Sequence, residues 1–263
     1  MDNRPIGLMD SGLGGLSVVK KVIAKMPHED TVFWGDQAHM PYGDRKQDDI
    51  INLARTGLNF LLSKDVKVVI FACNTMTAQA MPTLQAETDR QIIGVIQSGA
   101  LLAAKKTHNL KVGVIATTAT VESRYYTKEI QYRNPKIEVV EQATPKLAPL
   151  VEANEPSAVR QAIVAESLAP LQDYDFDSLV LGCTHYPFIA SEIQAAVGPQ
   201  VQLIDPADQV AQYTFNVLKR DGLLADRTVV GMHRYFTTGK AATFSHMARA
   251  WLNAPGLTAE HLD

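Results

Sequence analysis

Cysteine is scarce in this chain: its 263 residues include only two, Cys73 and Cys183. Secreted domains that depend on disulfides are short and rich in cysteine, so a disulfide framework is excluded. The two residues have no CxxC spacing and make a poor ligand set for zinc, so no metal site is expected. We therefore predict two reduced thiols.

The sequence also lacks a charge excess and long apolar runs. The formal net charge is only −3, and no basic tract offers a surface to nucleic acid, so no nucleic-acid partner is expected. No apolar segment approaches the roughly 20 residues of a membrane span. The first five residues lead directly into a predicted strand, without the apolar core of a signal peptide. These absences predict a cytoplasmic protein that does not associate with membranes.

Apolar runs of strand length alternate with helical patterns along the whole chain, which predicts βα units around mainly parallel sheets. The predicted strands are residues 6–9, 31–34, 66–71, 92–96, 112–116, 137–140, 178–181, 201–204 and 234–237. The predicted helices are residues 16–24, 48–62, 77–87, 99–106, 121–132, 157–168, 187–196, 210–218 and 241–252. The fold class is therefore α/β, and the length suits one large domain or two of modest size.

Two halves of the chain share a pattern. Residues 6–11 (IGLMDS) and 112–117 (VGVIAT) each form an apolar strand with glycine in second place and a small hydroxyl residue at the exit. Ser11 precedes Cys73 by 62 residues, and Thr117 precedes Cys183 by 66. We infer two pseudo-symmetric domains, with mainly parallel sheets flanked by helices, that face each other across an interdomain cleft holding the active site.

Each cysteine ends an apolar strand, and two hydrogen-bonding residues and a predicted helix follow, in VVIFACNT (68–75) and LVLGCTH (179–185). Open α/β sheets present reactive groups at the carboxyl ends of their strands. A buried cysteine is often only a small hydrophobic residue, and that interpretation stays open for each. The repeated context favours one proton acceptor and one proton donor on opposite sides of a small molecule. The helix dipoles, and His185 beside Cys183, would help to form the thiolate.

A glycine-rich turn, DSGLGGL, follows the first strand at residues 10–16. Gly12 and Gly14 fit two of the three places of a dinucleotide-binding G-x-G-x-x-G pattern, whereas Ser17 occupies the third. A nicotinamide-dependent dehydrogenase is therefore an alternative. Asp10 and Ser11 are better explained as a carboxylate and a hydroxyl that point into a polar cleft.

Further polar groups follow other strands. The turn Pro41-Tyr42-Gly43 is either a plain surface turn or a set of exposed N–H groups that bind a substrate carboxylate. Asn74, Thr75 and Thr184 add amide and hydroxyl donors beside the cysteines.

Taken together, DSGLGG at 10–15, PYG at 41–43, CNT at 73–75 and GCTHYP at 182–187 resemble the glutamate racemases of the aspartate/glutamate racemase family. The match runs from the first strand to at least residue 206, and FTTG at 236–239 is similar near the C-terminus. The resemblance implies a racemase without cofactor or metal that interconverts L- and D-glutamate, its small-molecule substrate, for peptidoglycan synthesis. It also implies a homodimer.

The resemblance carries specific roles. One thiolate removes the Cα proton and the other thiol supplies a proton to the opposite face, Cys73 acting on the D-enantiomer and Cys183 on the L-enantiomer. Asp10 and His185 match the acid and the imidazole that assist the thiols. The positions that match the substrate-binding set are Ser11, Pro41, Tyr42, Gly43, Asn74, Thr75, Thr117, Thr120, Glu152 and Thr184.

The resemblance places one lobe in residues 1–97 plus 207–263 and the other in 98–206. Three positions depart from the family pattern: Ala116 where glycine is usual, His39 in place of arginine, and Thr144 in place of cysteine. None removes a proton-transferring residue. Two other hypotheses are an aspartate racemase or related isomerase on the same scaffold, and a two-lobed binding protein without activity.

Overall fold

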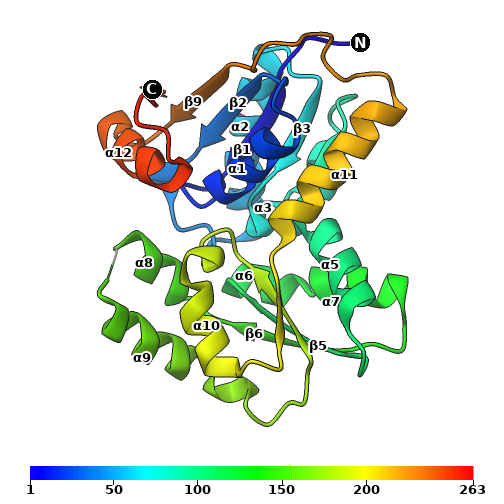
Figure 1. The fold of residues 1–263 in the computed structure, drawn as a ribbon, viewed down its shortest axis with the longest axis vertical. Helices are drawn as coiled ribbons and strands as arrows, with labels where there is room; N and C mark the ends of the chain where they lie inside the picture. Colours follow the sequence, from blue (N-terminus) through cyan, green and yellow to red (C-terminus); the bar gives the residue numbers. More distant parts are fainter. Residues whose placement is uncertain (154, 263) are drawn as a thin grey trace.

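The computed structural model describes residues 1–153 and 155–262, which build two separate parallel β-sheets flanked by helices (Figure 1). One sheet has six strands in the order β10-β9-β2-β1-β3-β4, and the other has four in the order β6-β5-β7-β8. All the strand pairs are parallel. We call the first sheet with its covering helices the first lobe and the second sheet with its helices the second lobe. The predicted α/β fold class is confirmed.

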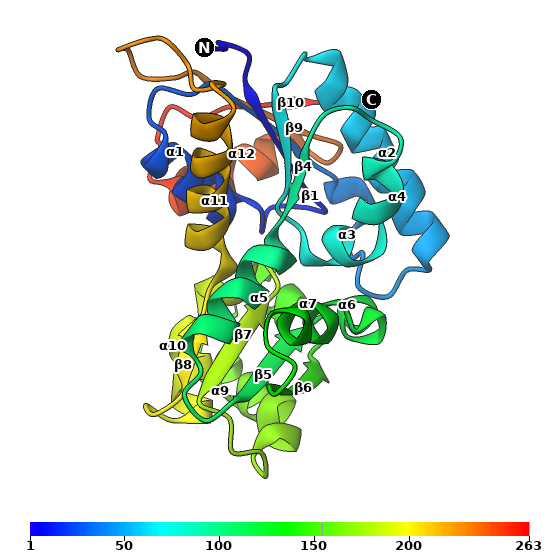
Figure 2. The same ribbon diagram turned by 90° about the vertical axis from the view of Figure 1, so that its right-hand side faces the viewer.

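The first lobe contains both chain termini and buries its sheet on both faces (Figures 1 and 2). Its strands are β1 (Ile6–Asp10), β2 (Thr31–Gly35), β3 (Val68–Phe71), β4 (Ile92–Gly94), β9 (His233–Thr237) and β10 (Ala259–His261). One face is covered by α1 (Leu16–Lys25), α11 (Pro206–Arg220) and α12 (Ala241–Leu252). The other is covered by α2 (Gln47–Ser63), α3 (Asn74–Gln79) and α4 (Met81–Gln85). Burial on both faces explains why β1, β2, β3 and β4 are mostly apolar runs.

The second lobe repeats this arrangement on a smaller scale. Its strands are β5 (Lys111–Ala116), β6 (Glu138–Ala143), β7 (Ser178–Gly182) and β8 (Gln202–Ile204). Its helices are α5 (Val95–Lys106), α6 (Thr118–Ser123), α7 (Tyr125–Arg133), α8 (Leu147–Glu152), α9 (Ser157–Leu168) and α10 (Ala190–Val197). The chain adds three short 3-10 turns, η1 (Gln37–His39), η2 (Ala169–Leu171) and η3 (Tyr186–Ile189). No helix in the described part of the chain has both the length and the apolar character needed to cross a membrane.

The strand orders explain the internal repeat. The run β2-β1-β3-β4 of the first sheet corresponds to β6-β5-β7-β8 of the second. The glycine strands β1 and β5 are therefore equivalent, and so are β3 and β7, which lead to Cys73 and Cys183. Only the first sheet is extended, by β9 and β10 from the C-terminal part of the chain.

Several elements differ from the predicted pattern. The strand predicted to reach residue 96 ends at Gly94, because the apolar run continues into α5. The helix predicted at 77–87 is two short helices, α3 and α4, and Pro82, which has no N–H, lies in the first turn of α4. The helix predicted at 121–132 is interrupted at Arg124, whose φ is 54°. The sequence pattern did not indicate α8 or β10.

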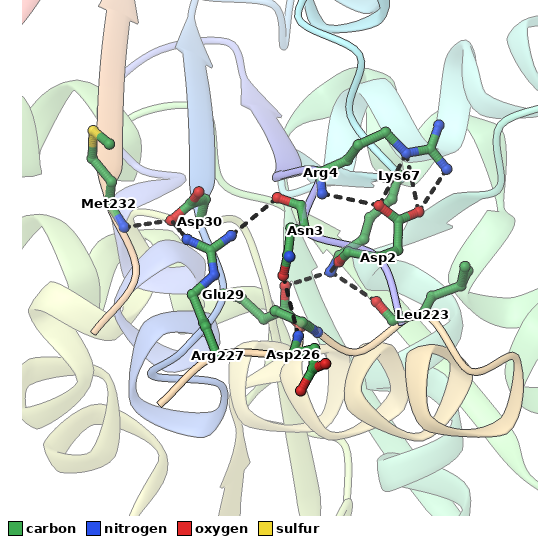
Figure 3. Close-up of polar contacts among 11 residues, drawn as sticks. Asp2, Asn3, Arg4, Glu29, Asp30, Lys67, Leu223, Asp226, Arg227 and Met232 are labelled. Carbon is green, nitrogen blue, oxygen red and sulfur yellow. Dashed lines mark hydrogen bonds and ion pairs between the residues drawn. The ribbon is translucent and has the colours of Figure 1, made fainter. Parts of the chain in front are cut away.

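A buried ion pair closes the first lobe at the amino ends of β2 and β3 (Figure 3). The Lys67 ammonium is fully buried and donates to Glu29 Oε2 at 2.5 Å. It also donates to the carbonyl groups of Asp2 at 2.7 Å and Leu223 at 2.8 Å. The second Glu29 oxygen accepts from the Ala225 amide at 2.8 Å. These contacts attach the N-terminal residues and the segment that follows α11 to the same end of the sheet.

Candidate active site

A cavity of about 240 Å³ lies where loops at the carboxyl ends of strands from both sheets meet. The predicted site residues that line it are Ser11, Pro41, Tyr42, Gly43, Cys73, Asn74, Thr75, Thr117, Glu152, Cys183, Thr184 and His185. Asp10 and Thr120 are fully buried behind this lining and contact residues within it. The structure thus brings together in one place residues that lie up to 175 positions apart.

Cys73 occupies the N-cap position of α3, two residues after β3 ends. Its Sγ lies 3.6 Å from the Ser11 hydroxyl oxygen. Burial, followed by the nearby charge of Asp10, raises the pKa of this thiol to about 12, and bonds with the Met76 amide and Ser11 offset only part of the rise. At neutral pH Cys73 is therefore a protonated thiol.

Cys183 lies in different surroundings. Its Sγ is 3.6 Å from His185 Nδ1, and His185 Nε2 is 2.7 Å from Glu152 Oε1. Burial disfavours a charged imidazole, but the hydrogen bonds with Cys183 and Glu152 outweigh it and raise the pKa of His185 to about 10. His185 thus lies between Cys183 and Glu152 and contacts both. The two thiols thus have different hydrogen-bond partners, Ser11 for Cys73 and His185 for Cys183.

Asp10 ends β1 and is completely buried. Burial raises the pKa of its carboxyl to about 6, and the charge of His185 and hydrogen bonds from Gly12, Gly15 and Thr184 limit the rise. The Thr184 hydroxyl donates to Oδ1 at 3.3 Å, so Asp10 bonds a residue of the opposite lobe. Asp10 acts on Cys73 through its charge, and Ser11 is the hydrogen-bond neighbour of that thiol.

A cluster of threonine hydroxyl groups crosses from one lobe to the other. Thr75 Oγ1 lies 2.9 Å from Thr117 Oγ1 and 3.3 Å from Thr120 Oγ1, and the last two are 2.9 Å apart. Thr117 also caps α6, since its side chain accepts from the Thr120 amide. Beside this cluster, the Asn74 side-chain oxygen accepts from the Tyr126 hydroxyl at 2.7 Å. The cleft wall is therefore rich in uncharged donors.

Two glycines lie where the lobes approach each other closely. A Cβ atom at Gly14 would lie 2.3 Å from Thr184 Oγ1, and one at Gly43 would lie 2.9 Å from the Thr117 Cβ. Larger residues would force these segments apart. Gly14 of the glycine-rich turn thus packs against Thr184 and His185 of the second lobe. This geometry argues against the dehydrogenase alternative.

Residues 6–214 match the family model described as Asp/Glu/Hydantoin racemase. The chain belongs to this racemase family. It is similar to the glutamate racemase of Lactobacillus johnsonii, with 58% identity covering 100% of this chain and 99% of that protein. Among solved structures, glutamate racemase isoform RacE1 of Bacillus anthracis aligns with a TM-score of 0.97 and 35% identity, covering 100% of this racemase and 98% of that chain. The glutamate racemase of Francisella tularensis, solved in complex with D-glutamate, aligns with a TM-score of 0.92 and 33% identity over the same shares.

The cleft of this racemase also includes residues that the sequence reasoning missed. They are Met40, Asp44, Thr118, Pro145, Ala148 and Pro149. The first three adjoin predicted motifs, so proximity in sequence was an available signal. The last three belong to α8 and the turn before it, an element that the pattern did not show. No lysine or arginine is among the described lining residues. In residues 1–153 and 155–262, no group of three or more His, Cys, Asp or Glu side chains is arranged to hold a metal ion.

Proposed function

We propose that this racemase interconverts L- and D-glutamate without a cofactor, by proton transfer at Cα between two cysteines. The observation that carries the proposal is the pair of thiols. They follow equivalent strands of two sheets, line one cavity, and have different hydrogen-bond partners. Inversion at a carbon needs an acceptor on one face and a donor on the other, and two facing lobes supply both.

In the L-to-D direction, the Cys183 thiolate removes the Cα proton of L-glutamate and becomes a thiol. The protonated Cys73 then gives its proton to the opposite face of the carbanion and becomes a thiolate. The imidazolium of His185 supports the initial thiolate, and Glu152 orients the ring through Nε2. The reverse reaction begins from the Cys73 thiolate, and the Ser11 hydroxyl is placed to stabilise it.

The uncharged donors of the cleft are suited to hold the two substrate carboxylates. Ser11, Asn74, Thr75, Thr117 and Thr184 offer hydroxyl and amide groups around the cavity. Because Cα–H is a very weak acid, catalysis depends on positioning and on stabilising the developing negative charge. A binding wall without a lysine or arginine leaves the carbanion without a competing fixed cation beside the carboxylates.

The test is incubation with L-glutamate in D₂O without added cofactor, following optical rotation and the Cα proton signal together. We expect rotation to fall while deuterium enters at Cα. Cys73→Ser and Cys183→Ser should each abolish racemisation, because each removes one of the two proton carriers. Cys73→Ser, which keeps Cys183, should still exchange the Cα proton of L-glutamate for deuterium without inversion. Cys183→Ser, which keeps Cys73, should do the same with D-glutamate.

The variant without both cysteines has no thiol at all, which makes it a matched control. Racemisation that survives in either single variant would exclude the two-thiol mechanism. Exchange of aspartate but not glutamate would keep the scaffold and change the substrate. Two relatives that are 58% identical to this chain carry the name glutamate racemase, and this supports glutamate over aspartate.

The resemblance supports four wider proposals. The reaction supplies D-glutamate for peptidoglycan synthesis, the protein works in the cytoplasm, and it assembles as a homodimer. The lobes divide at residues 97–98, in the first turn of α5, and at residues 206–207, at the start of α11; the chain passes between the two sheets at these helices.

A further inference from the structure

The carboxylate of Asp36, directly after β2, is almost completely buried and is contacted by three separate segments. Its side chain is 1% exposed. Oδ2 accepts from the Tyr42 hydroxyl at 2.5 Å, and Oδ1 accepts from the Thr238 hydroxyl at 2.6 Å and lies 2.8 Å from His39 Nδ1. A buried carboxylate requires such partners to offset its lost hydration. Asp36 therefore joins η1, the turn at 41–43 and the segment after β9 at one point.

The segment after β9 supports this arrangement from outside the cavity. The Thr238 amide donates to the Gly35 carbonyl at 3.1 Å, and the Thr238 hydroxyl oxygen accepts from the Ala38 amide at 3.1 Å. Thr237 adds a bond from its hydroxyl to Gln37 Oε1 at 3.1 Å. The FTTG sequence at 236–239 thus holds the start of the loop that leads to the cleft, although neither threonine lines the cavity.

Tyr42 connects Asp36 to the wall of the cleft. Tyr42 lines the cavity, and its hydroxyl donates to Asp36. Burial, together with the charge of Asp36, raises the pKa of Tyr42 well above its usual range, so the hydroxyl stays a donor. Within residues 1–153 and 155–262, neither the Tyr42 nor the Gly43 amide donates a hydrogen bond, whereas the Gly43 carbonyl accepts from the Ala119 amide of the second lobe at 2.9 Å. These two amides therefore have no protein acceptor in the described part of the chain.

We propose that Asp36, backed by Thr238, is a positioning residue that fixes the Tyr42 ring and thereby presents the Tyr42 and Gly43 amides to a substrate carboxylate. The inference rests on the proposed function for the identity of that substrate. It assigns the Tyr42 hydroxyl to anchoring the turn, and leaves recognition to the backbone.

The test compares Asp36→Asn, Tyr42→Phe and Thr238→Val with two controls. Thr238→Ser keeps the hydroxyl, and Asp30→Asn alters the carboxylate just before β2, where it accepts from Arg227 and the Met232 amide (Figure 3). We expect Asp36→Asn and Tyr42→Phe to raise KM for glutamate about tenfold with little change in kcat, because a binding contact equal in ground and transition states is lost. The double variant should not exceed the larger single effect, since both remove the same bond. Both controls should keep the wild-type KM.

Hydrogen–deuterium exchange of peptides covering residues 40–45 gives a readout that needs no activity, because the Arg45 amide donates to the Tyr42 carbonyl at 3.1 Å and reports on the order of the turn. Faster exchange in Asp36→Asn and Thr238→Val, but not in Thr238→Ser or Asp30→Asn, supports the positioning role even if the wild-type protein fails to racemise glutamate. That failure would refute the proposed function alone. Wild-type KM and wild-type exchange in folded Tyr42→Phe and Thr238→Val would overturn the positioning role, as would an equal KM change in Asp30→Asn.

Discussion

The Asp10 carboxyl has an energetic cost that a single substitution should reveal. Its pKa is raised from 3.8 to about 6 because the group is completely buried. Below pH 3.8 the carboxyl is neutral in the folded and unfolded chains, and it imposes no cost. As pH rises through about 6, the unfolded chain ionises more readily than the folded one, so stability is lost. At about 1.4 kcal/mol per pH unit of displacement, the loss is about 3 kcal/mol at pH 8 and about half of that at pH 5.

Asp10→Asn removes this titration and keeps the shape of the side chain. Its amide oxygen can still accept from the Gly12 amide, which lies 3.0 Å from Oδ2 in the wild type. The unfolding free energy of the variant minus that of the wild type should therefore increase by about 1.5 kcal/mol between pH 5 and pH 8. Urea denaturation at both pH values, with exposed Asp89→Asn as the control, measures this difference. A difference that is flat with pH, or that falls, would refute the reasoning. Greater stability together with lost racemisation would indicate that the charge is kept for chemistry.

Three further predictions concern separate parts of the molecule. His185→Asn should lower kcat/KM by about 10²–10⁴-fold, to the same degree in both directions because enantiomers have equal free energies; chiral chromatography of the product measures the loss, and a wild-type kcat/KM in the folded variant would contradict the role of His185. Lys67→Met should destabilise the protein by about 3–5 kcal/mol in urea unfolding, because buried Glu29 loses its counter-charge, and adding Glu29→Leu should recover most of the loss. Trp251→Ala should lower the melting temperature, since it removes the contact between the Trp251 and Phe188 rings, whose centroids are 3.9 Å apart. Trp251→Phe keeps an aromatic ring and should lower the melting temperature much less. Equal falls in melting temperature for the two variants would exclude the ring contact as the cause.

The strands that lead to the cleft were predictable because each is buried on both faces. Such strands are short apolar runs, and the carboxyl ends of parallel neighbours meet at one edge of a sheet. The positions of Cys73, Cys183 and the residues after them follow from that rule. In the structure β1 pairs with β3 and β5 pairs with β7, so each glycine strand lies beside the strand that leads to a cysteine.

The unpredicted parts depend on contacts between distant residues. Helix α8 has only six residues and includes Pro149, so no helical period stands out, and burial of Leu147 and Leu150 stabilises it instead. The contact of Glu152 with His185 could not be predicted from the pattern, because Glu152 is the last residue of that helix. The break at Arg124 is similar, because Glu141 on β6 accepts bonds from the Thr127 amide and hydroxyl at the start of α7. The bond from Thr184 to Asp10 joins residues 174 positions apart, beyond any local pattern.

The insertion of β9 between β2 and β10 has a consequence for synthesis on the ribosome. His233–Thr237 pairs with Thr31–Gly35, so the first sheet stays open along β2 until nearly the whole chain has emerged. The strands of the second sheet all lie within residues 111–204, and they can pair earlier. The lobe that begins the sequence therefore finishes folding last, and a chain that stops before residue 233 would expose an unpaired β2 edge, a ready template for association with other chains.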